Sequence, residues 1–193
     1  CSVPLLRTQL ICYMLNEREI EIQHIEASKT NPQCFEPLYK KYYEQILKFV
    51  YKRMDNLDDT REVTSVVFSK AISNINKYKD NGHPFSSWLY RIALNEITQF
   101  YRDSKKMRAI SIEEKGMKYI AEETGGYKRE LIAVLKKAMQ YLSEPELLLI
   151  ELRFFEERPF SEVAEIIGIT ENNAKVKTYR VIDKLKVIYT KIS

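Results

Sequence analysis

The chain has 193 residues, of which 45% are apolar and 30% charged, and its net charge is +4. These values are ordinary for a folded protein and exclude a wholly disordered chain or a collagen-like repeat. The 3 cysteines form no CxxC pair, which argues against a disulfide framework or a zinc site. No run of about 18 apolar residues is present, so we expect no stable membrane insertion and a cytoplasmic location.

The first residue leaves one alternative open. A lipid on Cys1 would make the chain an anchored or adaptor helical protein, but the apolar stretch that follows lacks the basic start of a signal peptide. We favour Met14 as the true beginning. Residues 1–30 are therefore interpreted as an N-terminal extension that carries a short helix from Glu17 to about Ala27.

Apolar residues recur at helical spacing almost throughout, and no segment alternates with period two. The pattern predicts an all-α fold of two small helical domains, residues 31–105 and 129–193, joined by a flexible linker at 106–128. The linker carries mixed charges and ends in two glycines. In the first domain we expect a helix from Asn31-Pro32 to near Met54. A second helix is capped by Asp58 or Asp59, and its inward-facing residues extend to Ile75 and Tyr78. A loop at Lys79–Pro84 then leads to a helix from Phe85 to Lys105.

In the second domain we expect four helices, at about Arg129–Leu142, Glu144–Glu157, Phe160–Ile167 and Glu171–Lys191. The sequence around Ser143, with Pro145 and Glu146, is typical of a capping box. Gly168 supplies the left-handed residue that ends a helix, and Thr170 caps the next one. A short helix, a glycine turn and a longer helix make a helix-turn-helix, whose second helix enters the DNA major groove.

The second helix of this motif has two different faces. Ala174, Thr178, Val181 and Leu185 share a narrow arc that should pack on the domain. The opposite face and its flanks supply the predicted duplex contacts: Asn172, Asn173, Lys175, Val176, Lys177, Arg180 and Lys184. Asn and Arg side chains pair with adenine and guanine edges, and Lys holds phosphates. Eight acids precede residue 172 from Glu144 on, and six bases follow it, which favours DNA on this face alone.

The helix predicted from Phe85 carries a second polar stripe. Arg91, Asn95, Thr98 and Arg102 follow one another at steps of four, three and four residues. Such a row suits single-stranded nucleic acid, whose bases are read on their edges. Aromatic side chains near the preceding loop are candidates for base stacking: Tyr78, His83, Phe85 and Tyr90.

These features together resemble the extracytoplasmic-function sigma factors of bacterial RNA polymerase. The resemblance rests on Phe85-Ser86-Ser87-Trp88-Leu89-Tyr90-Arg91-Ile92-Ala93-Leu94-Asn95, on the helix-turn-helix, on Phe35–Tyr43 and on Leu142–Phe155. It implies that the first domain binds the polymerase clamp and melts the minus-ten element, whereas the second reads the minus-thirty-five element. Its implied partners are core RNA polymerase (the beta-prime and beta subunits), promoter DNA and an anti-sigma factor.

The resemblance also implies residue roles in the first domain. Residues of the loop and of the polar stripe would hold the flipped base and backbone of the nontemplate strand: Asp80, Asn81, His83, Tyr90, Arg91, Asn95, Thr98 and Arg102. The clamp would be gripped by Glu62, Val63, Ser65 and Val66. The family usually has acids and a Gln before Phe68, and here Ser65 and Val66 take two of those places.

An enzyme is not expected. His24 and His83 lack metal-ligand spacing, and there is no glycine-rich phosphate loop or nucleophile elbow. We therefore predict no cofactor, no metal and no small-molecule substrate. The competing interpretation is a conventional helix-turn-helix regulator that binds duplex DNA without polymerase. Binding of the upstream element by the second domain requires that the Asn172–Arg180 face be exposed to solvent.

Overall fold

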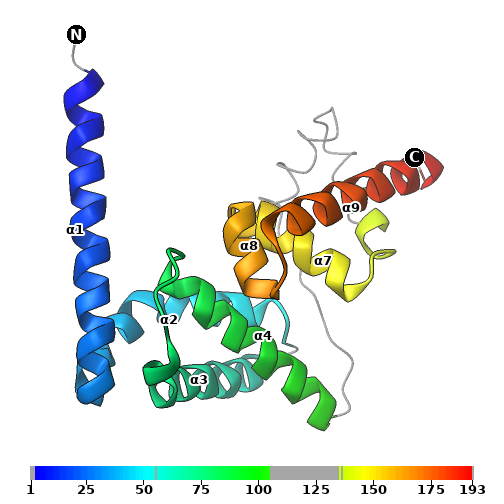
Figure 1. Ribbon diagram of the computed structural model, residues 1–193. Coiled ribbons are helices and arrows are strands. Elements are labelled where there is room, and N and C mark those ends of the chain that lie inside the picture. The colour runs from blue at the N-terminus through cyan, green and yellow to red at the C-terminus, as the bar shows by residue number, and fades with distance from the viewer. Residues whose placement is uncertain (1–2, 55, 105–134, 136, 193) are drawn as a thin grey trace. The chain divides into compact units, whose positions relative to one another are not determined.

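The computed structural model describes the backbone of residues 3–54, 56–104, 135 and 137–192, and their side chains from Glu17 on, except at 103, 104 and 192 (Figure 1). All regular structure in this part of the chain is helical, as predicted. The described residues form two compact units. The first unit runs to Lys79 and resumes at Ile92, and the second combines Asp80–Arg91 with the described residues from Leu135 onward.

The first unit is built from helices packed around one apolar core. Its elements are α1 (Val3–Thr30), η1 (Pro32–Phe35), α2 (Glu36–Tyr51), α3 (Leu57–Ser73), η2 (Ile75–Lys77) and the second half of α4 (Phe85–Ser104). Leu38, Ile46, Phe49, Val67 and Ala71 are at most 1% exposed. The predicted stripes of α2 and α3 therefore face the core.

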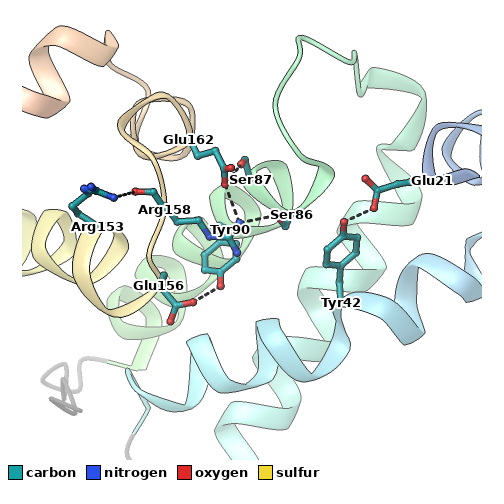
Figure 2. Close-up of polar contacts among 9 residues, drawn as sticks. All are labelled: Glu21, Tyr42, Ser86, Ser87, Tyr90, Arg153, Glu156, Arg158 and Glu162. Carbon is teal, nitrogen blue, oxygen red and sulfur yellow. Dashed lines mark hydrogen bonds and ion pairs between the residues drawn. The ribbon is translucent and has the colours of Figure 1, made fainter. Parts of the chain in front are cut away.

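The first helix is longer than predicted, because it begins at Val3 rather than near Glu17. Pro4 is tolerated in a first turn, and no glycine or further proline interrupts the chain before Pro32. The C-terminal part of α1 packs against η1, α2 and η2. There Glu21 accepts a hydrogen bond from the Tyr42 hydroxyl (Figure 2). It also accepts one from Lys41 Nζ at 2.9 Å.

Two predicted helix starts are corrected by their caps. Asn31 caps the short helix η1, accepting from Gln33 N, and α2 starts at Glu36 with Pro37 in its first turn. The third helix is capped by Asn56 rather than by Asp58 or Asp59, since Asn56 Oδ1 accepts from Asp59 N at 2.8 Å. The two aspartates lie in the first turn, where negative charge is favourable.

The second unit contains α7 (Glu144–Ile150), a π-helical turn η3 (Glu151–Phe155), α8 (Phe160–Ile167), α9 (Glu171–Ile192) and the first half of α4. The predicted helix Glu144–Glu157 is thus α-helical to Ile150 and continues as a π-helical turn to Phe155. Its predicted start is correct, and Ser143 N donates to the Glu146 carboxylate at 2.7 Å. The linker and most of the helix expected at 129–142 lie outside the described residues.

The helix-turn-helix forms as predicted (Figure 1). Gly168 ends α8 with φ 75° and ψ 39°, and its N–H donates to Ala164 O at 2.8 Å. Thr170 Oγ1 accepts from Asn173 N at 3.3 Å and so caps α9. A Cβ at position 168 would impose left-handed strain on this turn, which explains the glycine.

The turn after η3 holds a second left-handed residue, Glu157, at φ 54°. Replacing Glu157 by glycine should remove about 1 kcal/mol of backbone strain. We expect the thermal midpoint, followed by circular dichroism, to rise by about 2–4 °C. The matched control is Glu44→Gly inside α2, which should lower the midpoint because glycine weakens a helix interior. If Glu157→Gly also lowered the thermal midpoint, the backbone at Glu157 would not be strained.

Candidate nucleic-acid interface

Helix α9 buries one side and exposes the other. Ala174, Thr178 and Leu185 are 0% exposed and Val181 is 4% exposed, which confirms the predicted packing face. Thr178 Oγ1 also donates to Ala174 O at 2.8 Å, so this buried hydroxyl is satisfied. The packed side contacts α7 and α8, which fixes the rotation of α9 about its axis.

The opposite side of α9, here called the recognition face, is exposed along its length. It consists of Asn172, Asn173, Lys175, Val176, Lys177, Tyr179 and Arg180. The exposed face of α9 therefore carries amide, guanidinium, ammonium and apolar groups side by side. This is the set of groups that reads base edges and phosphates in a major groove.

Lys184 lies one turn beyond the recognition face and has a partner. Its Nζ lies 2.8 Å from the Glu146 carboxylate at the start of α7. Burial alone would raise the pKa of Glu146, but the hydrogen bonds from Lys184 and Ser143 outweigh burial and lower it. A phosphate that approached Lys184 would therefore have to compete with Glu146 for its ammonium group.

The predicted polar stripe on α4 is only partly exposed to solvent. Asn95, Thr98 and Arg102 are exposed. The Arg91 side chain is 42% exposed and its Nη1 lies 3.4 Å from Glu165 Oε1 of α8. In the preceding loop Asp80 and Asn81 are exposed. The Asp80 carboxylate accepts a hydrogen bond from Gly82 N–H, and the Asn81 side-chain amide oxygen accepts one from His83 N–H. These bonds hold the loop in a tight turn.

Three of the aromatic residues suggested for base stacking are buried instead. Tyr78 is 8%, Phe85 1% and Tyr90 0% exposed, because their rings fill the cores of the two units. The Tyr90 hydroxyl donates to Glu156 Oε2 at 2.6 Å, and the Arg158 guanidinium lies 4.7 Å from the ring centre (Figure 2). Burial, and secondarily the Glu156 charge, raises the pKa of Tyr90, so the hydroxyl stays protonated.

The predicted clamp contact on α3 is corrected at one residue. Glu62 and Ser65 are exposed and Val66 is 36% exposed, but Val63 is 4% exposed because it shares the buried stripe with Val67. Beside Ser65 lies a groove of about 670 Å³, which sequence reasoning missed; it is lined by Pro32, Gln33, Phe35, Glu36, Tyr39, Ser65, Phe68, Ser69 and Ile72.

The Tyr39 ring, 40% exposed, lies at 4.8 Å from Phe68 and 5.0 Å from Tyr43. The spacing of Tyr39 and Tyr43, four residues apart on a helix, is the signal that would have indicated this aromatic wall of the groove.

The part of the chain with described side chains contains no group of three potential metal ligands. Among the described helices, none has an apolar segment of the length and hydropathy that a bilayer crossing requires. Cys34 is a free thiol.

Comparison with known proteins identifies two family regions in the chain. Residues 38–107 match Sigma-70 region 2, and residues 138–187 match Sigma-70, region 4. The first match includes most of α2 and all of α3 and α4, and the second includes α8 and most of α9. The polar stripe of α4 therefore lies in the part that matches region 2, and the recognition face of α9 lies in the part that matches region 4.

Curated relatives match most of the chain. The chain is 24% identical over 148 residues to the RNA polymerase sigma factor SigV of Bacillus subtilis, which covers 77% of this chain and 86% of the relative. It is 26% identical over 161 residues to YlaC of the same organism (81% and 92%). It is 23% identical over 158 residues to the ECF RNA polymerase sigma factor BldN of Streptomyces coelicolor (79% and 59%).

Solved structures share the fold. The chain resembles CnrH, solved in complex with the cytosolic domain of CnrY, with a TM-score of 0.58 and 18% identity over 89% of this chain and 97% of the other. It also resembles RpoE of Bartonella quintana, solved with the anti-sigma factor NepR, with a TM-score of 0.55 and 17% identity over 81% and 96%. The chain belongs to the extracytoplasmic-function group of the sigma-70 family, the factors that bind core RNA polymerase and direct promoter-specific transcription initiation.

Proposed function

We propose that the recognition face of α9 reads the upstream promoter element. Asn172, Asn173 and Arg180 contact base edges in the major groove, Val176 packs on a thymine methyl group, and Lys175 and Lys177 hold phosphates. Lys184 joins them once Glu146 releases it. The support is the exposure of all these side chains, since the other face of the same helix is buried.

The polar stripe of α4 engages the nontemplate strand of the downstream element. Asn95 hydrogen-bonds the flipped base, and Arg91, Thr98 and Arg102 hold its backbone. The loop residues Asp80, Asn81 and His83 complete the base pocket. Extruding one base costs a few kcal/mol, which hydrogen bonds and stacking in a pocket recover. The exposed amide of Asn95 supports this role.

The α3 surface formed by Glu62, Ser65 and Val66 contacts the polymerase clamp, with the neighbouring aromatic groove taking part in the interface. Val63 is left out because it is buried. The exposed Val66 and Tyr39 side chains give this surface an apolar centre, while Glu62 adds one charge. Such a composition is typical of a protein–protein contact.

The remaining parts of the proposal follow from this division of labour. The two domains, residues 31–105 and 129–193, act as separate binding modules. Because the linker at 106–128 joins them, binding of one domain to the promoter raises the effective concentration of the other near its own DNA element. The chain works in the cytoplasm by binding rather than by covalent catalysis, and an anti-sigma factor holds it inactive.

Run-off transcription tests the proposal. The purified chain is mixed with core RNA polymerase and a pool of promoters from the same genome, including the one upstream of this gene. We expect transcripts from a subset of promoters that share two spaced elements, and none from core enzyme alone. A conventional regulator would instead bind one duplex tightly without polymerase and initiate nothing, and that result would reject the sigma assignment of the two faces.

A further inference from the structure

The loop between η2 and α4 contains a chemically reactive pair of residues. Asn81 is followed by Gly82, and it is the only asparagine in the chain that precedes a glycine. Asp80, Asn81 and Gly82 are exposed, and His83 is half-buried. Apart from the two chain neighbours of Gly82, no described residue places an atom within 4 Å of the point where a Cβ of Gly82 would stand. The backbone nitrogen of Gly82 is therefore sterically free to attack a neighbouring group.

Two hydrogen bonds in this turn each activate one partner of a reaction. The Gly82 N–H donates to Asp80 Oδ1 at 2.9 Å, and the His83 N–H donates to Asn81 Oδ1 at 3.4 Å. A carboxylate that accepts an N–H raises the electron density on that nitrogen. An N–H that donates to an amide oxygen stabilises the negative charge that develops there when the amide carbon is attacked. Gly82 N as nucleophile and Asn81 Cγ as electrophile are thus prepared within one turn.

The reaction that these contacts favour is deamidation. Gly82 N gives its proton to the Asp80 carboxylate and forms a bond to Asn81 Cγ, which closes a five-membered ring. The Cγ–Nδ2 bond then breaks, Nδ2 takes up the proton from Asp80, and ammonia leaves. The resulting succinimide adds one water molecule, which breaks either of the two bonds between its ring nitrogen and a carbonyl carbon. The products carry aspartate or isoaspartate at position 81.

We propose that Asn81 is a site of spontaneous deamidation promoted by the Asp80–His83 turn, and that the modified factor holds the downstream strand less tightly. The second part rests on the proposed place of this loop in the base pocket. Deamidation adds a negative charge next to Asp80, and isoaspartate also lengthens the backbone by one carbon atom. Repulsion between two like charges about 7 Å apart in water is close to RT, so affinity for the strand should fall about threefold.

Mass spectrometry of the incubated chain tests the modification without DNA. The full-length chain is held at physiological temperature and mildly alkaline pH, sampled over several days and digested. The mass change from amide to acid should appear at position 81 before it appears at any other asparagine. Protein isoaspartyl methyltransferase should methylate the same peptide. Deamidation that is spread evenly over the asparagines, or that is absent at position 81, would overturn the proposal.

Two comparisons test whether the turn, rather than the Asn-Gly dipeptide alone, promotes the reaction. A synthetic peptide of residues 77–86 has the same dipeptide without the fold, so the folded chain should deamidate faster than the peptide. Asp80→Ala removes the proton acceptor; a fully aligned base contributes about 100-fold or more, and for this exposed contact we expect deamidation to slow about tenfold. The matched control, Asp58→Ala at a site 96% exposed, should react at the wild-type rate. A folded chain no faster than the peptide, or an unchanged rate in Asp80→Ala, would overturn the role of the turn.

Two variants measure the effect on strand binding. Asn81→Asp reproduces the aspartate product, and Gln23→Glu makes the same change from amide to carboxylate at an exposed position of α1. Each is assembled with core RNA polymerase, and its affinity for a fluorescein-labelled single strand of the downstream element is measured. We expect the loss of about threefold only for Asn81→Asp. Equal affinity of the two variants would overturn the effect on binding, while run-off transcription by the freshly purified chain decides the proposed function separately.

Discussion

Replacing Asn95 by alanine is expected to slow open-complex formation by about tenfold or more, because the flipped base loses its amide partner, and removing a polar partner costs about 1–3 kcal/mol. Asn95 is exposed, so the substitution should leave the fold intact. The measurement is permanganate reactivity of downstream thymines over time, with core polymerase and a responsive promoter.

Two controls accompany the Asn95 variant. Binding of the upstream duplex should be unchanged, since α9 is untouched, and Lys48→Ala at an exposed site on α2 should melt promoters normally. Open complexes that form at the wild-type rate in the Asn95→Ala factor would mean that the base pocket is assigned to the wrong residue.

Replacing Arg180 by alanine is expected to relax specificity at one position of the upstream element. A bidentate contact to guanine contributes about 1–3 kcal/mol of discrimination, so preference for that base should fall by roughly 5- to 150-fold. Transcription from promoters carrying each of the four bases at every upstream position measures this preference.

The comparison with Lys177→Ala separates base reading from phosphate binding. Loss of a phosphate contact should weaken transcription from all upstream sequences alike and reduce its salt dependence. Lys191→Ala, at the exposed C-terminal end of α9, is the matched control for loss of one positive charge. An Arg180→Ala factor that loses activity equally on all four bases would place this residue among the phosphate contacts instead.

The sequence predicted the helix-turn-helix well because its signals are local. Gly168, Thr170 and the spacing of Ala174 and Leu185 act within a few residues of one another, and the structure confirms each. The exposed recognition face followed from the same periodicity. Helix ends were less predictable where two caps compete, as at Asn56 and Asp59, since either side chain can accept the same kind of hydrogen bond.

The features that sequence reasoning missed depend on contacts between distant residues. Tyr90 pairs with Glu156, 66 positions away, and Ser86 with Arg158, 72 positions away. Helical periodicity predicts which residues three or four positions apart are neighbours on a helix. It does not predict contacts between residues that are far apart in the sequence. Tyr90 was therefore predicted to stack on a base, whereas the structure buries it. The π-helical turn at Glu151–Phe155 was missed for a different reason: its apolar spacing fits an α-helix equally well.

The most direct test of the account is promoter melting in a three-component assay. Permanganate reactivity in the downstream element of a responsive promoter is measured with core polymerase alone, with the chain alone, and with both. Reactive thymines are expected only when both are present, at positions set by the distance from the upstream element. Melting by core enzyme without the chain, or tight duplex binding by the chain with no melting in the mixture, would contradict it.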